Sequence, residues 1–382
     1  MRYLLFCVLC LFVVFCEAQD TTYARQIIKK LTSRELLGRG YVNNGVNKAA
    51  DFIAKEIKQI GLQKFGKSYS QPYSFAVNTF PSTITVSVDS KPLTAGKHYL
   101  IEPTATTTKA GYQLFKTDSV TYQAIDGRQT APLKVILKKK LTYTVATHTQ
   151  SITTIELLKD SFPKELSAIE VQFENKFFPK FKCQNIVGYI KGTQLPDSFL
   201  VFTAHYDHLG AMGKEAYFPG ANDNASGVSV LLNLAKYFKS HPVKYSVAFI
   251  FFSGEEAGLL GSKYYSEHPL FPLQKIKFLT NLDLLGTGDD GAMVVNASVF
   301  TSVFEKLNSI NNEQHYLKQL KKRGKAANSD HYWFTEKGVP SFFIYTMGGI
   351  QAYHDIYDIE KTLPLTDYVD ACKLFIEFYK QF

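Results

Sequence analysis

Two rhythms of apolar and polar residues alternate along much of the chain. In residues 48–62 apolar side chains recur every three or four positions, and residues 228–238 show the same spacing, which is the period of one buried helix face. From residue 185 onward, such segments alternate with short apolar runs, typical of strands buried on both faces. This alternation predicts an α/β fold, a three-layer α/β/α sandwich around a mostly parallel mixed sheet.

The expected strands of this sheet are rich in Val, Ile, Leu and Phe. They are residues 185–190, 198–204, 245–253, 276–285 and 339–346. A last amphipathic segment, residues 367–381, predicts a helix near the end of the chain.

Residues 80–180 follow a different pattern. In TITVSVD, apolar residues alternate with polar ones, which is the period of a strand with one buried face. Thr, Val and Tyr stay frequent through the rest of this segment. We therefore predict a β-rich insertion or accessory subdomain here. It would separate an N-terminal helical part, residues 19–79, from the main α/β domain, residues 181–382.

Residues 1–18 have the composition of a secretory signal peptide. A single Arg precedes an apolar run that is too short to span a bilayer comfortably, and small residues follow it. Lipoprotein processing at Cys16 is the alternative, and the bulky Phe15 before it argues against that. Cleavage after Ala18 predicts a secreted, periplasmic or other extracellular protein. No later stretch is apolar enough for a stable membrane anchor.

Cysteine content and charge argue against two classes of function, a thiolate zinc site and nucleic-acid binding. Cys183 and Cys372 would remain in the mature chain, either as one disulfide or as two buried thiols. Cys7 and Cys10 form a CxxC motif only within segment 1–18, so the mature chain would have none, and a thiolate zinc site is excluded there. The net charge is +9, but the basic clusters at residues 138–140 and 318–325 lack the interleaved aromatics of nucleic-acid-binding motifs. We interpret them as solvated surface and expect no nucleic-acid partner.

Histidine and acidic residues gather where predicted strands end. Most candidates follow an apolar run, and one, in PGANDNASG, opens the predicted helix at 228–238. The candidates are His205, Asp223, Glu255, Glu256, Asp283 and His354. Open α/β sheets place their ligands at the carboxyl ends of the strands. Zinc accepts imidazole nitrogen and carboxylate oxygen, so these residues predict a shared metal site.

Each candidate also has a simpler explanation when taken alone. Asp223 could be a helix cap, and the adjacent Glu255 and Glu256 could lie in a solvated turn. Two adjacent carboxylates after a buried strand are costly unless their charge is compensated. Near a cation, one Glu would bind metal and the other would act as a general base toward water. Asp207 could reach the far ring nitrogen of His205 and fix its tautomer.

Six segments in order match one known family. They are AHYDHLG, PGANDNASG, FFSGEEAGLLGSKYY, NLDLLG, SDHYWFTEKGVP and YHDIYD. With them, residues from about 185 to 380 resemble the secreted dizinc aminopeptidases, a family that also includes glutaminyl cyclases and the glutamate carboxypeptidase–transferrin receptor branch. A weaker match covers residues 33–62. Any one segment is a weak signal, whereas six in the same order are specific.

The resemblance implies a site with two zinc ions. His205 and Asp283 would bind one ion, Glu256 and His354 would bind the other, and Asp223 would bridge them. The implied activity is release of N-terminal residues from peptides, so the expected partners are peptide or protein N-termini.

The resemblance also implies roles for the residues around the ligands. Glu255 would be the general base and acid, and Asp207 would support His205. Tyr353 would stabilise the tetrahedral oxyanion, as a Tyr does in some relatives. Asp358 matches a recurrent acidic position with a supporting role.

Three alternatives to an aminopeptidase remain open. Glutaminyl-peptide cyclotransferases share the GEE and final His motifs, but they typically lack NDNASG and carry Trp at the place of Tyr353. A carboxypeptidase-type relative would differ in pocket residues that the sequence does not place. A catalytically inactive relative would have lost ligands, whereas all five positions and the base are present.

Two features depart from the family pattern. Asp355 follows His354 where many relatives have a small residue, so it either alters the surroundings of that ligand or faces solvent. Residues 80–180 occupy the place where several relatives insert a protease-associated domain, but their pattern is too divergent to assert that fold.

Overall fold

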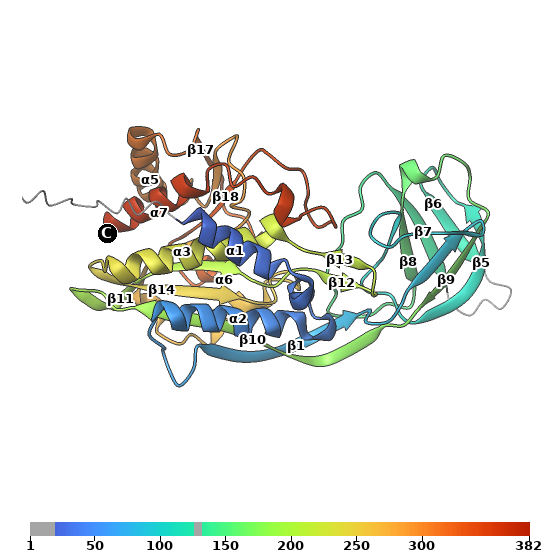
Figure 1. Cartoon of the computed structure of the whole chain (residues 1–382), viewed down its shortest axis with the longest axis horizontal. Helices are drawn as coiled ribbons and strands as arrows, with labels where there is room; N and C mark the ends of the chain where they lie inside the picture. The colour runs from blue at the N-terminus through green and yellow to red at the C-terminus, as the bar shows by residue number, and fades with distance from the viewer. Residues whose placement is uncertain (1–19, 126–131) are drawn as a thin grey trace, which may run out of the picture.

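A computed structural model describes residues 20–125 and 132–382. The expected signal peptide, residues 1–18, and the alternative processing site Cys16 therefore lie outside the described residues. The described chain has a larger part, built of a sheet and helices, and a smaller part built of strands, which lie side by side (Figure 1).

An eight-stranded mixed sheet forms the middle of the larger part. Its strand order is β1-β10-β14-β11-β15-β18-β16-β17, and β14, β11, β15 and β18 at its centre run parallel. The strands are β1 (Ser70–Thr79), β10 (Lys176–Ile190), β11 (Leu195–His205), β14 (Tyr245–Phe252), β15 (Ile276–Leu282), β16 (Ala292–Val295), β17 (Leu320–Lys322) and β18 (Ser341–Thr346).

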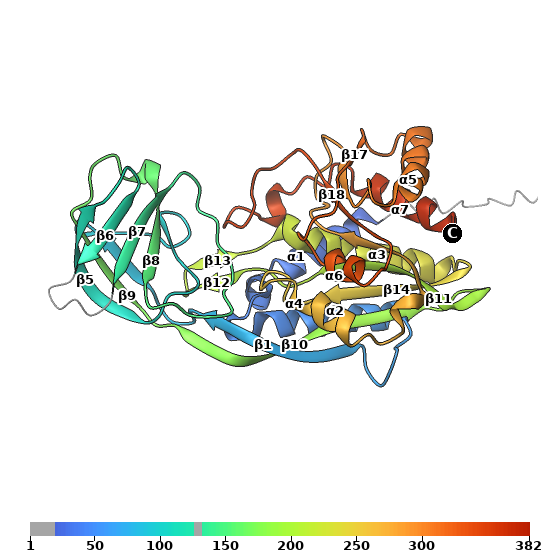
Figure 2. The same cartoon turned by 180° about the vertical axis from the view of Figure 1, so that it is seen from behind.

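Helices cover both faces of this sheet. One face carries α1 (Thr21–Leu31), α2 (Gly45–Ile60), α3 (Gly227–Ser240), α5 (Thr301–Gln314) and α7 (Tyr368–Lys380). The other carries α4 (Leu260–Glu267) and α6 (His331–Glu336), seen in front of the sheet in Figure 2.

The central strands are apolar on both sides because each side faces a different helix layer. In β11, Leu200 and Phe202 belong to the core under α3, whereas Phe199 and Val201 belong to the core that includes residues of α4 and α6. The predicted three-layer α/β/α fold with a mostly parallel mixed sheet is thereby confirmed.

A second eight-stranded sheet builds the smaller part, with the strand order β3-β2-β9-β5-β6-β7-β8-β4. Neighbouring strands are antiparallel except β7 and β8. The strands are β2 (Thr85–Val88), β3 (Lys91–Pro92), β4 (Tyr99–Ile101), β5 (Thr108–Lys116), β6 (Thr121–Ile125), β7 (Leu133–Lys138), β8 (Thr153–Leu158) and β9 (Ala168–Phe173). All lie within residues 80–180, where the sequence predicts a β-rich insertion.

The expected domain boundaries fall next to long strands. Residues 70–79, inside the segment expected to be helical, form strand β1 at the edge of the main sheet. Strand β10 runs unbroken from Lys176 to Ile190 and so crosses the expected boundary at residue 180. The pair β1 and β10 therefore connects the two parts, and the boundary itself stays a prediction.

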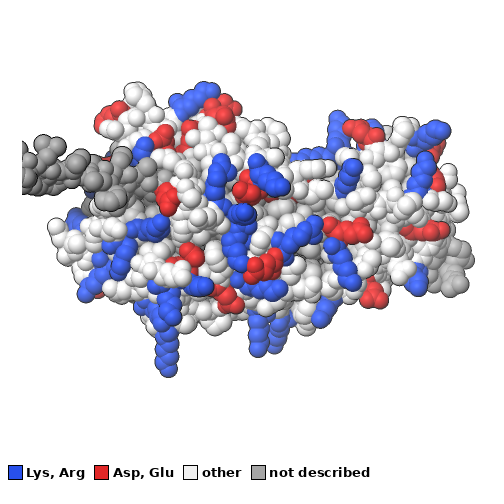
Figure 3. All heavy atoms as spheres, viewed as in Figure 1, with Lys and Arg blue, Asp and Glu red and all other residues white. Residues whose placement is uncertain are grey.

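Three further sequence expectations concern the thiols, the membrane and the surface charge. Cys183 and Cys372 are buried, free thiols, so the second of the two alternatives holds. Within residues 20–125 and 132–382, every helix is too short or too polar to cross a bilayer. On the face shown in Figure 3, Lys and Arg are spread over both parts and interspersed with Asp and Glu.

Candidate metal centre

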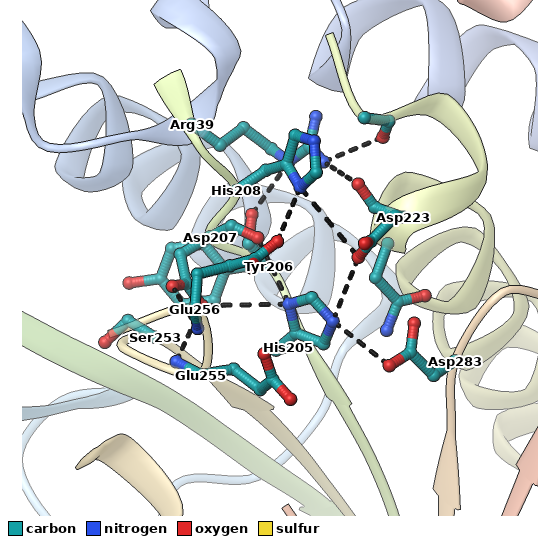
Figure 4. Close-up of polar contacts among 12 residues, drawn as sticks. Arg39, His205, Tyr206, Asp207, His208, Asp223, Ser253, Glu255, Glu256 and Asp283 are labelled. Carbon is teal, nitrogen blue, oxygen red and sulfur yellow. Dashed lines mark hydrogen bonds and ion pairs between the residues drawn. The ribbon is translucent and has the colours of Figure 1, made fainter. Parts of the chain in front are cut away.

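The predicted ligands meet at the carboxyl edge of the central parallel strands. His205 is the last residue of β11, Glu256 follows β14, and Asp283 follows β15. Asp223 lies in the irregular turn Ala221–Ser226 before α3, and His354 lies in the loop after β18. All five line one cavity of about 420 Å³, together with Glu255. Figure 4 shows four of these ligands pointing toward one another.

His205 lies between two of the carboxylates. Its Nε2 is 3.3 Å from Oδ1 of Asp223 and 3.2 Å from Oδ2 of Asp283. The three side chains are buried, and one ligand atom from each lies within 4.8 Å of the other two. They form a first trio of metal-ligating groups.

His354 lies between the other pair of carboxylates. Its Nε2 is 3.2 Å from Oδ2 of Asp223 and 3.3 Å from Oε2 of Glu256. Asp223 therefore directs one carboxylate oxygen to each histidine. The two trios share this residue and differ in the other two members.

The nitrogen–oxygen distances around both histidines fit a tetrahedral cation. Ligands at 2.0–2.1 Å from a zinc ion, arranged tetrahedrally, lie about 3.3–3.4 Å from one another. The four nitrogen–oxygen distances are 3.2–3.3 Å. Imidazole nitrogen and carboxylate oxygen are also the donors that zinc accepts. The residues thus fit the metal that the sequence predicts.

The charges of the buried carboxylates also favour a bound cation. Burial raises the pKa of Asp283. Burial and nearby Asp223 would raise the pKa of Glu256, but His354 and His208 outweigh them and lower it to about 2. The carboxylates in turn stabilise the protonated form of a histidine. Burial would lower the pKa of His354, but Glu256 and Asp223 raise it to about 11. Within the described residues, no Lys or Arg lines the cavity. A divalent cation would balance this excess of negative charge.

Glu255 borders the same cavity and differs from Glu256 in its surroundings. Burial, with Glu256, Asp330 and Asp283 nearby, raises the pKa of Glu255 well above its ordinary value, although His205 acts in the opposite direction. A carboxylate with a raised pKa beside the cavity has the property that a general base needs near neutral pH.

Asp207 lies behind His205 and contacts it through the main chain. Nδ1 of His205 is 3.1 Å from the backbone oxygen of Asp207, whereas the carboxylate Oδ1 is 3.8 Å away. That carboxylate instead accepts the backbone N–H groups of Glu255 and Glu256 and the hydroxyl of Tyr41. The supporting contact predicted for His205 thus comes from the carbonyl of Asp207.

His208 contacts the centre but is absent from the predicted ligands. It is fully buried, and its Nδ1 lies 2.7 Å from Oε1 of Glu256, opposite the oxygen that faces His354. Carboxylate ligands are commonly held by such hydrogen bonds from behind. Because a carboxylate ligand usually accepts a hydrogen bond from a neighbouring side chain, His208, three residues after His205, could have been predicted as such a donor.

Arg39 is a second residue that the sequence analysis missed. Its side chain is fully buried and donates to five backbone carbonyls. These acceptors are Leu31, Tyr206, Pro219, Gly220 and Asp223. Arg39 thereby joins the loop after His205 to the turn that carries Asp223, and it brings a positive charge close to the acidic cluster.

Comparison with known proteins agrees with this arrangement. A model described as peptidase family M28 matches residues 185–378. The chain belongs to peptidase family M28. The family resemblance carried by the six sequence segments is therefore confirmed.

Relatives of this M28 chain include aminopeptidases. It is 31% identical to aminopeptidase YwaD of Bacillus subtilis over 186 residues, 45% of this chain and 37% of YwaD. The alignment thus spans less than two fifths of that curated relative.

Two solved structures share the fold. BSAP, a zinc aminopeptidase from Bacillus subtilis, aligns over 95% of both chains with a TM-score of 0.71 and 20% identity. A glutaminyl cyclase of Bacteroides thetaiotaomicron aligns over 95% of this chain and 98% of its own, with a TM-score of 0.56 and 13% identity.

The remaining predicted residues surround the predicted ligands. Tyr353 is 46% exposed, lines the cavity and stacks on the ring of His354, with a centroid distance of 4.0 Å. Asp358 is buried and accepts the backbone N–H groups of Asn222 and Asp223, so it holds the turn of the shared ligand. Burial raises the pKa of Asp358 to about 6.

Proposed function

We propose that this M28 chain is a zinc-dependent aminopeptidase with two zinc ions. One observation carries the proposal: Asp223 directs one oxygen to His205 and the other to His354. His205 and Asp283 would hold one ion, and Glu256 and His354 the other. When bound, zinc acidifies water and polarises a carbonyl oxygen.

Glu255 would move the proton in the reaction. It lines the cavity beside the ligands, and its raised pKa suits a base that takes a proton from water and later gives it to the leaving amine. Asp207 holds the backbone of Glu255 in place through a hydrogen bond.

Tyr353 would stabilise the negative charge that develops on the carbonyl oxygen. Burial and the surrounding carboxylates, Asp223 first among them, raise the pKa of its phenol. The phenol therefore stays protonated at neutral pH and can donate a hydrogen bond to an oxyanion.

The walls of the cavity favour a peptide N-terminus over a C-terminus. Leu259, Leu284, Phe343 and Tyr345 line it beside the acidic cluster. A free α-amine would be attracted to these carboxylates, and an apolar side chain would contact the apolar walls. A C-terminal carboxylate calls for a cationic partner, and among the described residues no Lys or Arg lines the cavity. These features support an aminopeptidase over a carboxypeptidase-type relative.

The alternative activity is glutaminyl-peptide cyclisation. The glutaminyl cyclase with the same fold is 13% identical to this chain, so the likeness concerns the fold alone. Both trios are complete here and include Asp283 as well as Glu256. This full ligand set supports hydrolysis and also argues against an inactive relative.

Secretion is part of the same proposal. The basic residue, apolar run and small residues of segment 1–18 support export and removal of that segment. A peptidase outside the cytoplasm would act on the N-termini of extracellular peptides.

One assay separates the candidate activities. The purified protein is incubated with a series of amino-acid 4-nitroanilides and with a glutaminyl peptide, each with and without a chelator. We expect release of 4-nitroaniline, fastest for apolar residues, which the chelator abolishes and added zinc restores. Cyclisation of the glutaminyl peptide without hydrolysis would overturn the proposal in favour of a cyclase, and inactivity on all substrates would indicate an inactive relative.

A further inference from the structure

The β-rich part contacts the loop that carries His354. The backbone N–H of Tyr143 donates to the backbone oxygen of His354 at 2.8 Å. Nζ of Lys140 lies 3.2 Å from Oδ2 of Asp355 and donates to the backbone oxygen of Gln351 at 2.9 Å. Residues 140–143, here called the strap, thus bind the loop of a predicted metal ligand at three points.

The backbone of His354 needs such contacts. Its φ is 54°, in the left-handed region that side chains other than glycine seldom adopt. A residue stays in this conformation only where its surroundings hold it. The strap supplies one of the holding contacts directly, because Tyr143 binds the carbonyl of His354 itself.

Asp355 connects the strap to the rest of the loop. Its side chain is 9% exposed. Of the two alternatives that the sequence leaves open, the solvent-facing acid is therefore excluded. The carboxylate accepts the backbone N–H of Tyr357 at 2.9 Å and pairs with Lys140. The acid that departs from the family pattern therefore turns the loop and ties it to the β-rich part at once.

The strap also packs against a second ligand-bearing segment. The ring of Tyr143 stacks on Phe218 with a centroid distance of 4.7 Å and an interplanar angle of 9°. Phe218 ends β13 (Ala216–Phe218), which pairs with β12 (Gly210–Met212) in the hairpin between His205 and Asp223. Figure 1 shows this hairpin between the two parts. Its apolar residues share one core with the β-rich strands.

In the part of the chain that the structure describes, the strap does not line the cavity itself and contacts the loops that carry the ligands. Among the described residues, those that line the cavity all lie between 205 and 354, outside the β-rich segment. We propose that Lys140 and Tyr143 are positioning residues that hold His354 in the geometry of a metal ligand, and that this is a function of the β-rich part. The inference rests on the proposed function for the identity of the ion.

The test compares three lysine variants in the full chain. Lys140→Met removes the contacts to Asp355 and Gln351. Lys138→Met is the matched control, because Lys138 is exposed to a similar degree and pairs with Glu156 inside the β-rich part. Lys140→Arg keeps the positive charge. Hydrogen–deuterium exchange over residues 347–358 is measured in zinc-free protein, and zinc loss to a chelator is measured in loaded protein.

We expect Lys140→Met to exchange faster over residues 347–358 and to lose one zinc equivalent about tenfold faster than the wild type, as when outer partners of metal ligands are removed. Lys138→Met and Lys140→Arg should match the wild type in both measurements. Wild-type behaviour of Lys140→Met, or an equal effect of Lys138→Met, overturns the inference. If Lys140→Met does not fold, Asp355→Asn is measured in its place with the same expectations. A wild type that takes up no zinc refutes the proposed function instead, and the exchange measurement still tests the strap.

Discussion

The carboxylate of Asp207 accepts the backbone N–H of Glu255, with 3.2 Å between Oδ1 and the nitrogen. Its other oxygen accepts the N–H of Glu256 at 3.3 Å and the hydroxyl of Tyr41 at 2.7 Å. One buried carboxylate therefore orients both the proposed base and a proposed ligand. Its backbone oxygen meanwhile contacts His205. The proposed roles of Glu255 and Glu256, as base and ligand, therefore depend on a turn whose backbone N–H groups bind Asp207.

Tyr41→Phe tests this support. The variant removes a hydrogen bond to a buried carboxylate, so the free energy of unfolding should fall by about 1.5–3 kcal/mol. The zinc affinity should also fall, because the turn that presents Glu256 loses part of its support. Denaturant unfolding and zinc competition measure the two quantities. Tyr69→Phe, which removes a hydroxyl bonded to the backbone of Leu62 away from the site, is the control and should keep its zinc affinity. Unchanged zinc binding in Tyr41→Phe would refute the supporting role.

Glu255→Gln separates the base from the ligands. Gln is nearly isosteric with Glu but cannot take a proton, so kcat should fall about 10²–10⁴-fold. The zinc content should equal that of the wild type, because Glu255 belongs to neither trio. Metal analysis and steady-state kinetics are compared with Glu377→Gln, a surface variant that should be fully active. An active Glu255→Gln enzyme would rule out the assigned mechanism.

The pH dependence of turnover follows from the environment of Glu255. Burial and the nearby acids raise its pKa well above 4.5. A general base works only when ionised, so kcat/KM should rise with pH through this raised pKa. The midpoint of the acidic limb is therefore expected above pH 4.5. The profile is measured with zinc content checked at each pH, and a midpoint at or below 4.5 would contradict the assignment.

Arg39→Met tests the link between the two ligand loops. The substitution leaves five buried backbone carbonyls without their donor, and each unsatisfied buried acceptor costs about 1–3 kcal/mol. We expect a loss of at least about 3 kcal/mol in the free energy of unfolding, measured in urea. Arg34→Met, at an exposed neighbour, should stay within about 0.5 kcal/mol of the wild type. A similarly small change in Arg39→Met would show that these hydrogen bonds contribute little.

The sequence predicts the sheet and the ligands because both depend on local patterns. The apolar run of β11 ends at His205, and the run of β14 ends just before Glu255, so strand order brings these side chains to one edge. Arg39 and Tyr41 lie more than 160 residues before their partners Tyr206 and Asp207 and belong to no apolar period. Contacts of this kind arise from the packing of α1, α2 and the turn between them against the main sheet.

The sequence does not predict the contact between the two parts, for a related reason. Residues 138–140 form a basic cluster, which sequence alone assigns to solvent. In the structure the side chain of Lys140 is 49% exposed, and it also pairs with Asp355, more than 200 residues later in the chain. Both residues are polar and lie in loops or at strand ends, where no periodicity marks a partner. Strand β10 likewise crosses the expected domain boundary, because its first part pairs with β1 as far as Lys176 and its apolar end pairs with β14.

The most direct test of the account identifies the first product released from a peptide. A decapeptide with a free N-terminal leucine and its N-acetylated counterpart are incubated with the protein, with and without a chelator, and the products are identified by mass spectrometry. We expect stepwise loss of single residues from the free N-terminus, no cleavage of the acetylated peptide, and no cleavage with chelator until zinc is restored. Cleavage from the C-terminus or inside the peptide, or turnover that is unaffected by the chelator, would contradict this expectation.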